Sequence, residues 1–175
     1  MSVYFSELCA AMNRLAAVQN SVFLGQAVAC PGTAMSRTLE GVPSGKKIEF
    51  PVAEDTQLGA ATGMSIRGLL PICIYPRWNF LLLAASQLVL HLDKIPIYSR
   101  GGYRPKVIIR TAVASDDPMD PGPQHLGDFS DMFSKILAVV RVVKLDNAYA
   151  IREQYLNALE RDTSTILVEY ARNYG

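Results

Sequence analysis

The feature that most constrains the fold is a series of short, almost wholly apolar runs separated by segments with helical periodicity. Residues 69–75, 107–111 and 166–170 are the clearest runs. A strand exposed to water on one face alternates apolar and polar residues, whereas a strand covered on both faces is apolar throughout. Such strands alternate with helices along the whole sequence. This pattern predicts an α/β fold, a doubly wound, mostly parallel sheet with helices on both faces.

The expected elements follow one another along the chain, and Ser6 is a plausible N-cap for the first helix. Helices are expected over residues 6–17, 55–67, 79–94, 128–135 and 148–160, and strands over residues 21–25, 47–50, 69–75, 107–111, 139–144 and 166–170. Residues 30–47 and 114–127 are rich in residues that favour turns and are expected to be loops, the first with room for a short helical turn. Long loops in compact domains are usually functional.

Length and composition favour one domain over residues 1–175, because a chain of this size that is half hydrophobic can bury one good core. The net charge of +1 gives no basic footprint for nucleic acid or an anionic membrane surface. The longest apolar stretch, residues 80–85, is far shorter than the roughly 20 residues that a membrane span needs. We therefore expect no nucleic-acid or membrane partner and, without a signal segment, a cytoplasmic location.

Motifs for several common chemistries are missing. The sequence contains no P-loop, no Gly-x-Gly-x-x-Gly, no Cys-x-x-Cys pair and no Gly-x-Ser-x-Gly. Cys9, Cys30 and Cys73 are odd in number and scattered in apolar surroundings, which favours reduced, buried thiols over disulfides or a metal site. We expect no metal ligands in this chain.

Four residues that follow expected strands or lie in an expected loop are candidates for catalysis or ligand binding. Glu54 follows strand 47–50, Trp78 and Phe80 follow strand 69–75, and His125 lies in the loop 114–127. Ligands on parallel sheets bind at the carboxyl ends of the strands, where these side chains would lie. Each also has an ordinary explanation, as a helix-start acid, as core packing or as an idle loop histidine. The residues alone leave both interpretations open.

Sequence blocks in this chain keep the order and spacing of a known family. Residues 51–54 (Pro-Val-Ala-Glu), 59–64 (Gly-x-x-x-Gly-Met) and 68–72 (Gly-Leu-Leu-Pro-Ile) resemble blocks of the β subunits of 2-oxo acid dehydrogenases. Residues 122–125 (Gly-x-Gln-His) resemble the active-site histidine loop of that family. These subunits belong to the transketolase-like thiamine-diphosphate enzymes. The resemblance covers roughly residues 22–170 and corresponds to the pyrimidine-binding domain and its thiamine-diphosphate-binding fold.

The resemblance implies roles for the candidate residues. The glutamate that matches Glu54 hydrogen-bonds a ring nitrogen of the cofactor's aminopyrimidine and favours the imino tautomer, which removes a proton from the thiazolium carbon. Phe80 would stack on the pyrimidine. Apart from the resemblance, the aromatic run over residues 75–80, which includes Trp78, offers further flat surface for a heteroaromatic ring. His125 would face the substrate as a proton or hydrogen-bond donor. We therefore expect Glu54 and His125 to be catalytic, and Glu54, Phe80 and Trp78 to bind thiamine diphosphate.

Departures from the family imply a partner. The Gly-Asp-Gly motif that holds magnesium and the diphosphate in the second thiamine domain has no match, since residues 127–129 are Gly-Asp-Phe. The C-terminal domain of the β subunits is also missing. We therefore expect an α-type subunit to hold magnesium and the diphosphate, with an α2β2 assembly as the expected form.

The resemblance implies decarboxylation of a small 2-oxo acid and transfer of the acyl or aldehyde unit to an acceptor. One alternative is a transketolase-like transfer of a two-carbon unit between sugars, for which Arg77 or Arg100 is the hint, since a basic residue would contact a sugar phosphate. Another is a non-catalytic subunit that only regulates its partner. The presence of Glu54, Phe80 and His125 together argues against this last alternative.

Overall fold

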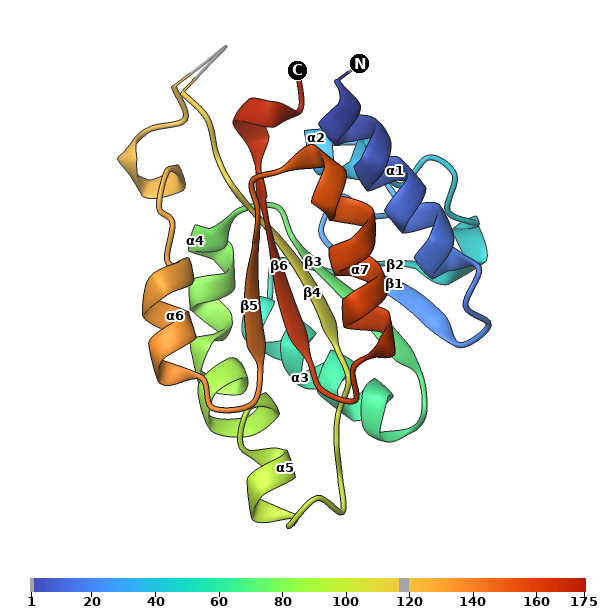
Figure 1. The fold of residues 1–175 in the computed structure, drawn as a ribbon, viewed down its shortest axis with the longest axis vertical. Helices are drawn as coiled ribbons and strands as arrows, with labels where there is room; N and C mark the ends of the chain where they lie inside the picture. Colours follow the sequence, from blue (N-terminus) through green and yellow to red (C-terminus); the bar gives the residue numbers. More distant parts are fainter. Residues whose placement is uncertain (1, 117–119) are drawn as a thin grey trace.

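The computed structural model of the protein describes residues 2–116 and 120–175. In these ranges six strands form one sheet in the order β2-β1-β3-β4-β6-β5, and every neighbouring pair is parallel (Figure 1). The strands are β1 Ser21–Gly25, β2 Lys47–Glu49, β3 Leu70–Tyr75, β4 Ile108–Val113, β5 Arg141–Leu145 and β6 Thr165–Tyr170. The predicted parallel sheet is confirmed.

Helices cover both faces of this sheet, which confirms the doubly wound α/β architecture (Figure 1). The α-helices are α1 Val3–Ala16, α2 Ala34–Arg37, α3 Glu54–Ile66, α4 Trp78–Leu81, α5 Ile95–Tyr98, α6 Ser130–Ile136 and α7 Ile151–Glu160. The first core lies under α1, α2 and α7, and the second lies under α3, α4 and α6.

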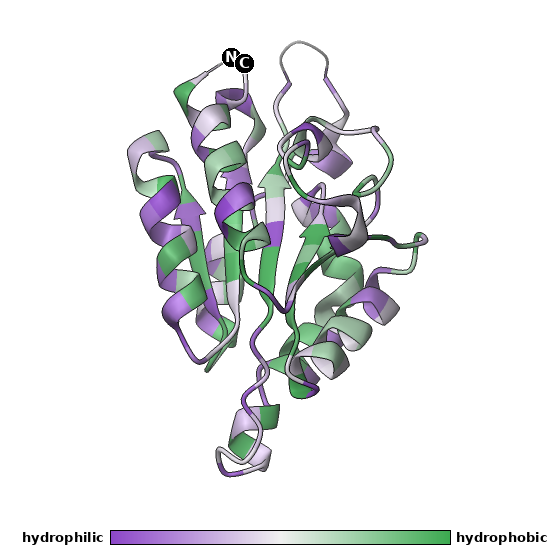
Figure 2. Cartoon of the chain, turned by 90° about the vertical axis from the view of Figure 1, so that its right-hand side faces the viewer, coloured by the Kyte–Doolittle hydropathy of each residue, from purple (hydrophilic) through white to green (hydrophobic). Residues whose placement is uncertain are grey.

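The two cores explain why β3 is apolar throughout. Successive side chains of β3 point to opposite faces, so that Ile72 and Ile74 enter the first core while Cys73 and Tyr75 enter the second. All six residues of β3 are buried. In Figure 2 the central strands are mostly green, that is hydrophobic, whereas the helices and loops carry many purple, hydrophilic segments.

The first helix begins earlier than predicted. Ser2, not Ser6, is the N-cap of α1, and its side chain accepts a hydrogen bond from the Phe5 backbone N–H at 3.1 Å. The earlier start places Tyr4 and Phe5 on the buried face of the helix. The Ser2 hydroxyl also donates to the Asn173 carbonyl at 2.7 Å, which joins the two ends of the described chain.

The single helix predicted over residues 79–94 is interrupted. After α4 the chain forms a 3-10 turn over Leu82–Ala84 and a π-helix over Gln87–Leu92. The π-helix is followed by Asp93, whose fully buried carboxylate accepts hydrogen bonds from the backbone N–H groups of residues 138–140. In the described ranges no single helix could cross a membrane, and only the bent pair Trp78–Ala84 and Gln87–Tyr98, at 64°, has sufficient length and apolar character.

Candidate functional site

A cavity of about 360 Å³ lies at the carboxyl edge of the sheet, next to the ends of β1 and β3. Its lining residues follow β1, β3 and β4 in the sequence and are Gln26, Ala27, Thr33, Pro76, Arg77, Phe80, Pro121 and His125. The chain leaves β1 toward α2 on one face of the sheet, and it leaves β3 toward α4 on the other. Loops that diverge from neighbouring parallel strands in this way leave a crevice between them.

Gly25 and Glu49 shape the loop on one side of this cavity. A Cβ on Gly25 would lie 2.3 Å from the Ile74 carbonyl oxygen, so glycine is required where β1 approaches β3. The Glu49 carboxylate accepts hydrogen bonds from the backbone N–H groups of residues 27–30 at 2.6 to 3.3 Å. Desolvation raises the pKa of Glu49, but these N–H groups shift the pKa below its ordinary value. Ala27 is thereby held at φ 54°, directly after Gln26.

Glu54 is the first residue of α3 and only 6% of it is exposed. Its Oε1 accepts a hydrogen bond from Gln26 Nε2 at 3.1 Å, and its backbone carbonyl accepts one from the Tyr75 hydroxyl at 3.0 Å. Burial raises the pKa of Tyr75, which keeps this phenol a neutral donor. Because Gln26 lines the cavity, it connects the Glu54 carboxylate with that space.

Phe80 and His125 lie together in the cavity wall. Their ring centroids are 5.6 Å apart and the rings meet edge to face at 78°. His125 Nδ1 is buried and has no hydrogen-bond partner within the described residues. Buried polar atoms are nearly always paired in folded proteins, so this nitrogen has hydrogen-bonding capacity that the chain does not use. The structure therefore brings Phe80 and His125 to one edge of the sheet with Glu54, which reaches the cavity through Gln26.

Trp78 lies elsewhere, in the second core. Its side chain is fully buried, its ring stacks on Phe133 at a centroid distance of 5.1 Å, and its Nε1 donates to Ser130 Oγ at 3.2 Å. The indole is absent from the cavity lining. Trp78 follows β3 as predicted, but it is the first residue of a helix and turns inward, away from the face that Phe80 presents to the cavity. The geometry gives it a packing role.

Two cavity residues, Gln26 and Thr33, were not singled out by the sequence. Gln26 directly follows an apolar strand, and that position was the available signal. Thr33 is the N-cap of α2, where its side chain accepts from the Ser36 backbone N–H at 3.0 Å. Neither residue type is distinctive for catalysis, so only the folded arrangement shows that they face Phe80 and His125.

In the described part of the chain, no group of three or more His, Cys, Asp or Glu residues is arranged to hold a metal ion. The three cysteines are free thiols, as predicted. The expectation that all three are buried is met only by Cys73: Cys9 is partly exposed, and Cys30, in the loop that Glu49 holds, is exposed. Cys73 is fully buried in β3, and this burial raises the pKa of its thiol to about 11.

Two solved structures share this fold. A split gene transketolase, described as an inactive beta4 tetramer, superposes with a TM-score of 0.73 at 16% identity, over 96% of this chain and 51% of that one. A transketolase from Campylobacter jejuni also gives a TM-score of 0.73, at 15% identity, over 95% of this chain and 25% of that one. At these identities the likeness concerns the fold alone.

Sequence comparison gives a more specific result. The pyruvate dehydrogenase E1 component subunit beta of Mycoplasma genitalium is 28% identical over 163 residues, which cover 89% of this chain and 48% of that protein. The chain thus spans about half the length of this curated relative. Residues 6–175 match the family described as the transketolase pyrimidine-binding domain. Since the match covers nearly the whole sequence, the chain belongs to the transketolase pyrimidine-binding domain family.

Proposed function

We propose that this chain is the pyrimidine-binding subunit of a split thiamine-diphosphate enzyme that decarboxylates a small 2-oxo acid and passes the acyl or aldehyde unit to an acceptor. The observation that carries the proposal is the environment of Glu54. This buried carboxylate meets a neutral side-chain donor, Gln26, beside a cavity lined by Phe80 and His125. A carboxylate with unused acceptor capacity suits a ligand that donates a hydrogen bond to it or shares its proton.

The residues around the cavity fit an aminopyrimidine ring. Phe80 presents an aromatic surface for stacking, and Glu54 can hold a proton against a ring nitrogen. His125, with its buried and unpartnered Nδ1, can donate a hydrogen bond to an oxygen of the substrate on which charge develops. When bound, thiamine diphosphate supplies the electron sink for decarboxylation. This chain contributes orientation, a proton held at Glu54 and a donor at His125.

We assign the diphosphate and its magnesium to a partner chain. No Gly-Asp-Gly motif occurs in this sequence. The curated relative is named as a subunit beta, and one structural neighbour is described as a split gene transketolase whose beta4 form is inactive. These names support an α-type partner, and the form that we propose for the pair is an α2β2 assembly with the cofactor between the subunits. A cytoplasmic location stays a prediction.

Transfer of a two-carbon unit between sugars is a second candidate function, and Arg77 is the observation that favours it. Arg77 lines the cavity, and its Nη1 donates to the Pro76 carbonyl at 2.8 Å. Within the described residues its guanidinium forms no ion pair. A cavity arginine without a carboxylate partner suits the phosphate of a sugar phosphate.

Reconstitution tests the proposal. The chain should be produced alone and together with a candidate α-type chain that carries a Gly-Asp-Gly motif, and thiamine diphosphate with Mg²⁺ should be titrated by calorimetry. We expect binding by the pair and little or none by this chain alone, because the diphosphate and metal carry much of the contact. Micromolar, magnesium-dependent binding by this chain alone would overturn the partnership.

Substrate assays on the reconstituted pair separate the two reactions. Release of CO₂ from pyruvate or a related 2-oxo acid supports the first, whereas ketose phosphate consumption with an aldose phosphate acceptor supports the second. Arg77→Gln should impair only the sugar reaction, and Arg67→Gln at the exposed end of α3 is the matched control. A pair that binds the cofactor and turns over neither substrate class would point to a regulatory subunit.

A further inference from the structure

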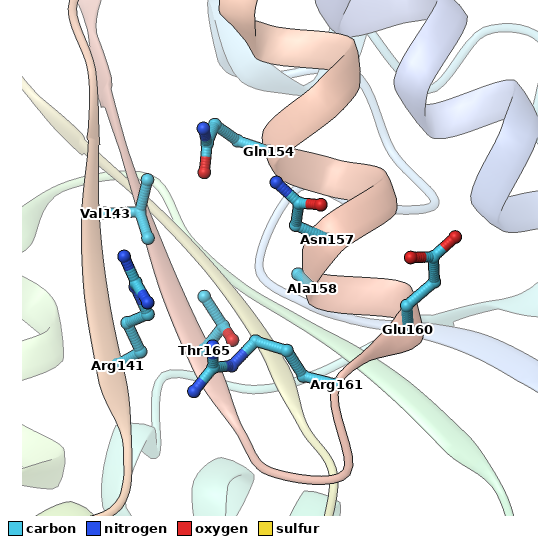
Figure 3. A pocket seen from close by; sticks show the side chains of 8 residues that line it. All are labelled: Arg141, Val143, Gln154, Asn157, Ala158, Glu160, Arg161 and Thr165. Carbon is cyan, nitrogen blue, oxygen red and sulfur yellow. The ribbon is translucent and has the colours of Figure 1, made fainter.

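A second cavity of about 360 Å³ lies on the α7 side of the sheet, between that helix and the edge strand β5 (Figure 3). Arg141 and Thr165 begin β5 and β6 and are register partners in the sheet. Arg161 is the C-cap of α7. These residues belong to the amino edge of the sheet, whereas the candidate site occupies the carboxyl edge. The second cavity is therefore a separate site.

Polar atoms in this cavity lack partners. Thr165 is only 2% exposed, and its Oγ1 has no hydrogen-bond partner in the described part of the chain. The same is true of the buried Nε of Arg161. A hydroxyl and a guanidinium N–H that are withdrawn from water without partners each cost stability. Figure 3 shows the Arg161 side chain extending beside Thr165, so both unpaired groups border the same space.

The cavity is also positively charged. Arg141 and Arg161 both line it, and neither forms an ion pair among the described residues. Glu160 is a lining carboxylate, but its side chain points away from both arginines in Figure 3. Asn157 and Gln154 add amide groups from α7. Two guanidinium groups with neutral donors beside them match the charge and the several oxygens of a phosphate group.

Arg161 has a simpler possible role, because a cation at the C-terminus of a helix interacts favourably with the helix dipole. That role accounts for its charge. It does not account for Arg141 on a different element, or for the unpaired hydroxyl of Thr165. An oxyanion in the cavity would account for all three.

We propose that the cavity between β5 and α7 binds a phosphate group, either inorganic phosphate or the phosphoryl end of a small metabolite, through Arg141, Arg161 and Thr165. The ligand accepts hydrogen bonds from both guanidinium groups and from the Thr165 hydroxyl. This binding is independent of the chemistry proposed for Glu54 and His125, because it involves the opposite edge of the sheet.

Titration of the full chain with sodium phosphate and with glycerol phosphate, at an ionic strength held constant with NaCl, tests the site. We expect one saturable site per chain and a rise in melting temperature that grows with ligand concentration. Arg161→Gln should weaken binding by roughly tenfold or more, since a hydrogen bond to a charged group is lost. The stronger of the two ligands identifies the source, because tighter glycerol phosphate binding indicates a phosphorylated metabolite and tighter phosphate binding indicates the free ion.

A pair of substitutions at Thr165 guards against general unfolding. Thr165→Val removes only the hydroxyl, so the free protein should be as stable as the wild type or more stable, while phosphate affinity falls. Thr165→Ser should retain binding. Arg67→Gln, at an exposed arginine of α3, is the control for net charge. Equal responses to phosphate and NaCl, or equal affinity in the wild type, Arg161→Gln and Thr165→Val proteins, would overturn the proposal.

Discussion

Two buried glutamates show how differently this fold uses the same side chain. Glu169 in β6 is fully buried and accepts hydrogen bonds from Arg110 Nε at 2.7 Å, from Arg110 Nη2 at 3.0 Å and from Tyr155 Oη at 2.6 Å. The Tyr174 hydroxyl also donates to it. Glu54, at the start of α3, accepts from the neutral amide of Gln26. One carboxylate is saturated by a cation and two phenols, and the other keeps acceptor capacity.

The difference separates a structural carboxylate from one available to a ligand. Burial lowers the pKa of Arg110, but the neighbouring Glu169 raises it more, so the Arg110 guanidinium keeps its charge inside the sheet. Arg110 also donates to Thr38 Oγ1 at 3.2 Å, which ties the loop after α2 to β4. Since buried charges are tolerated when paired and fully hydrogen-bonded, Glu169 needs nothing further. Glu54 is connected to the cavity through Gln26 and keeps unused acceptor capacity.

The largest effect should come from Glu54→Gln. Glutamine keeps the length of the side chain, so the free energy of unfolding should change little, whereas the exchangeable proton is lost. Turnover by the reconstituted pair should fall about 10²–10⁴-fold, the usual range for a positioned proton transfer. The direct measurement is hydrogen–deuterium exchange at the thiazolium carbon of thiamine diphosphate. Exchange at the wild-type rate would show that Glu54 is an ordinary acidic residue at a helix start, so that neither Glu54 nor Glu169 would act on a ligand.

Glu169→Gln should show the opposite pattern. Removing one partner leaves the Arg110 charge buried without compensation, which typically lowers the free energy of unfolding by about 3–5 kcal/mol. Urea denaturation of the full chain measures this. The double variant Arg110→Met with Glu169→Leu is the control, since it removes both charges and should be more stable than the single variant. A single variant as stable as the wild type would show that the pair is not needed to hold β4 and β6 together.

The sheet could be predicted from the sequence because each buried strand is recognisable from its own short apolar run. β3, β4 and β6 are rich in apolar residues and buried on both faces, and such runs form parallel strands. Helix ends were less predictable, because Ser2 and Ser6 are chemically equivalent caps and only packing against the sheet decides between them. The contact that follows the interrupted helix also had no local signal, since Asp93 accepts hydrogen bonds from the backbone of residues 138–140, far away in the chain.

The candidate site was predictable only in part. Glu54, Phe80 and His125 lie near the strand ends to which the sequence and the family resemblance pointed. Trp78 follows the same strand as Phe80, and aromatic character does not reveal which ring faces the core. Gln26 was missed because its importance is its hydrogen bond to Glu54, a contact between residues 28 positions apart.

Phe80→Ala should have a smaller effect that separates Phe80 from Trp78. Phe80 is partly exposed beside His125, so its loss should barely alter folding. Lost stacking is worth about 0.5–1.5 kcal/mol, which predicts cofactor binding by the reconstituted pair weakened about 2- to 13-fold. Calorimetric titration with thiamine diphosphate is the measurement. Trp78→Phe is the comparison variant and should alter stability without altering affinity. Weaker cofactor binding by the Trp78→Phe protein, with unchanged binding by the Phe80→Ala protein, would show that Trp78 contacts the cofactor.

The smallest effect concerns Asp93, a third buried carboxylate. It tests whether a carboxylate whose hydrogen bonds come mainly from backbone N–H groups, rather than from a buried cation, also serves to stabilise the fold. Burial raises the pKa of Asp93, but hydrogen bonds from Lys94 and from three backbone N–H groups lower it below its ordinary value. A carboxyl group whose pKa is lower in the folded state stabilises the fold above its unfolded pKa of about 3.9, and this contribution is lost as the pH falls through the folded pKa. Asp93→Asn should therefore make the free energy of unfolding fall less steeply below about pH 4. The control is Asp131→Asn, at an exposed aspartate paired with Lys144, which should leave the wild-type pH dependence nearly unchanged. An equal decline of the unfolding free energy with pH in the two variants would show that backbone N–H groups do not favour the charged form of a buried carboxyl group. The contrast between Glu169 and Glu54 would then depend on Arg110 alone.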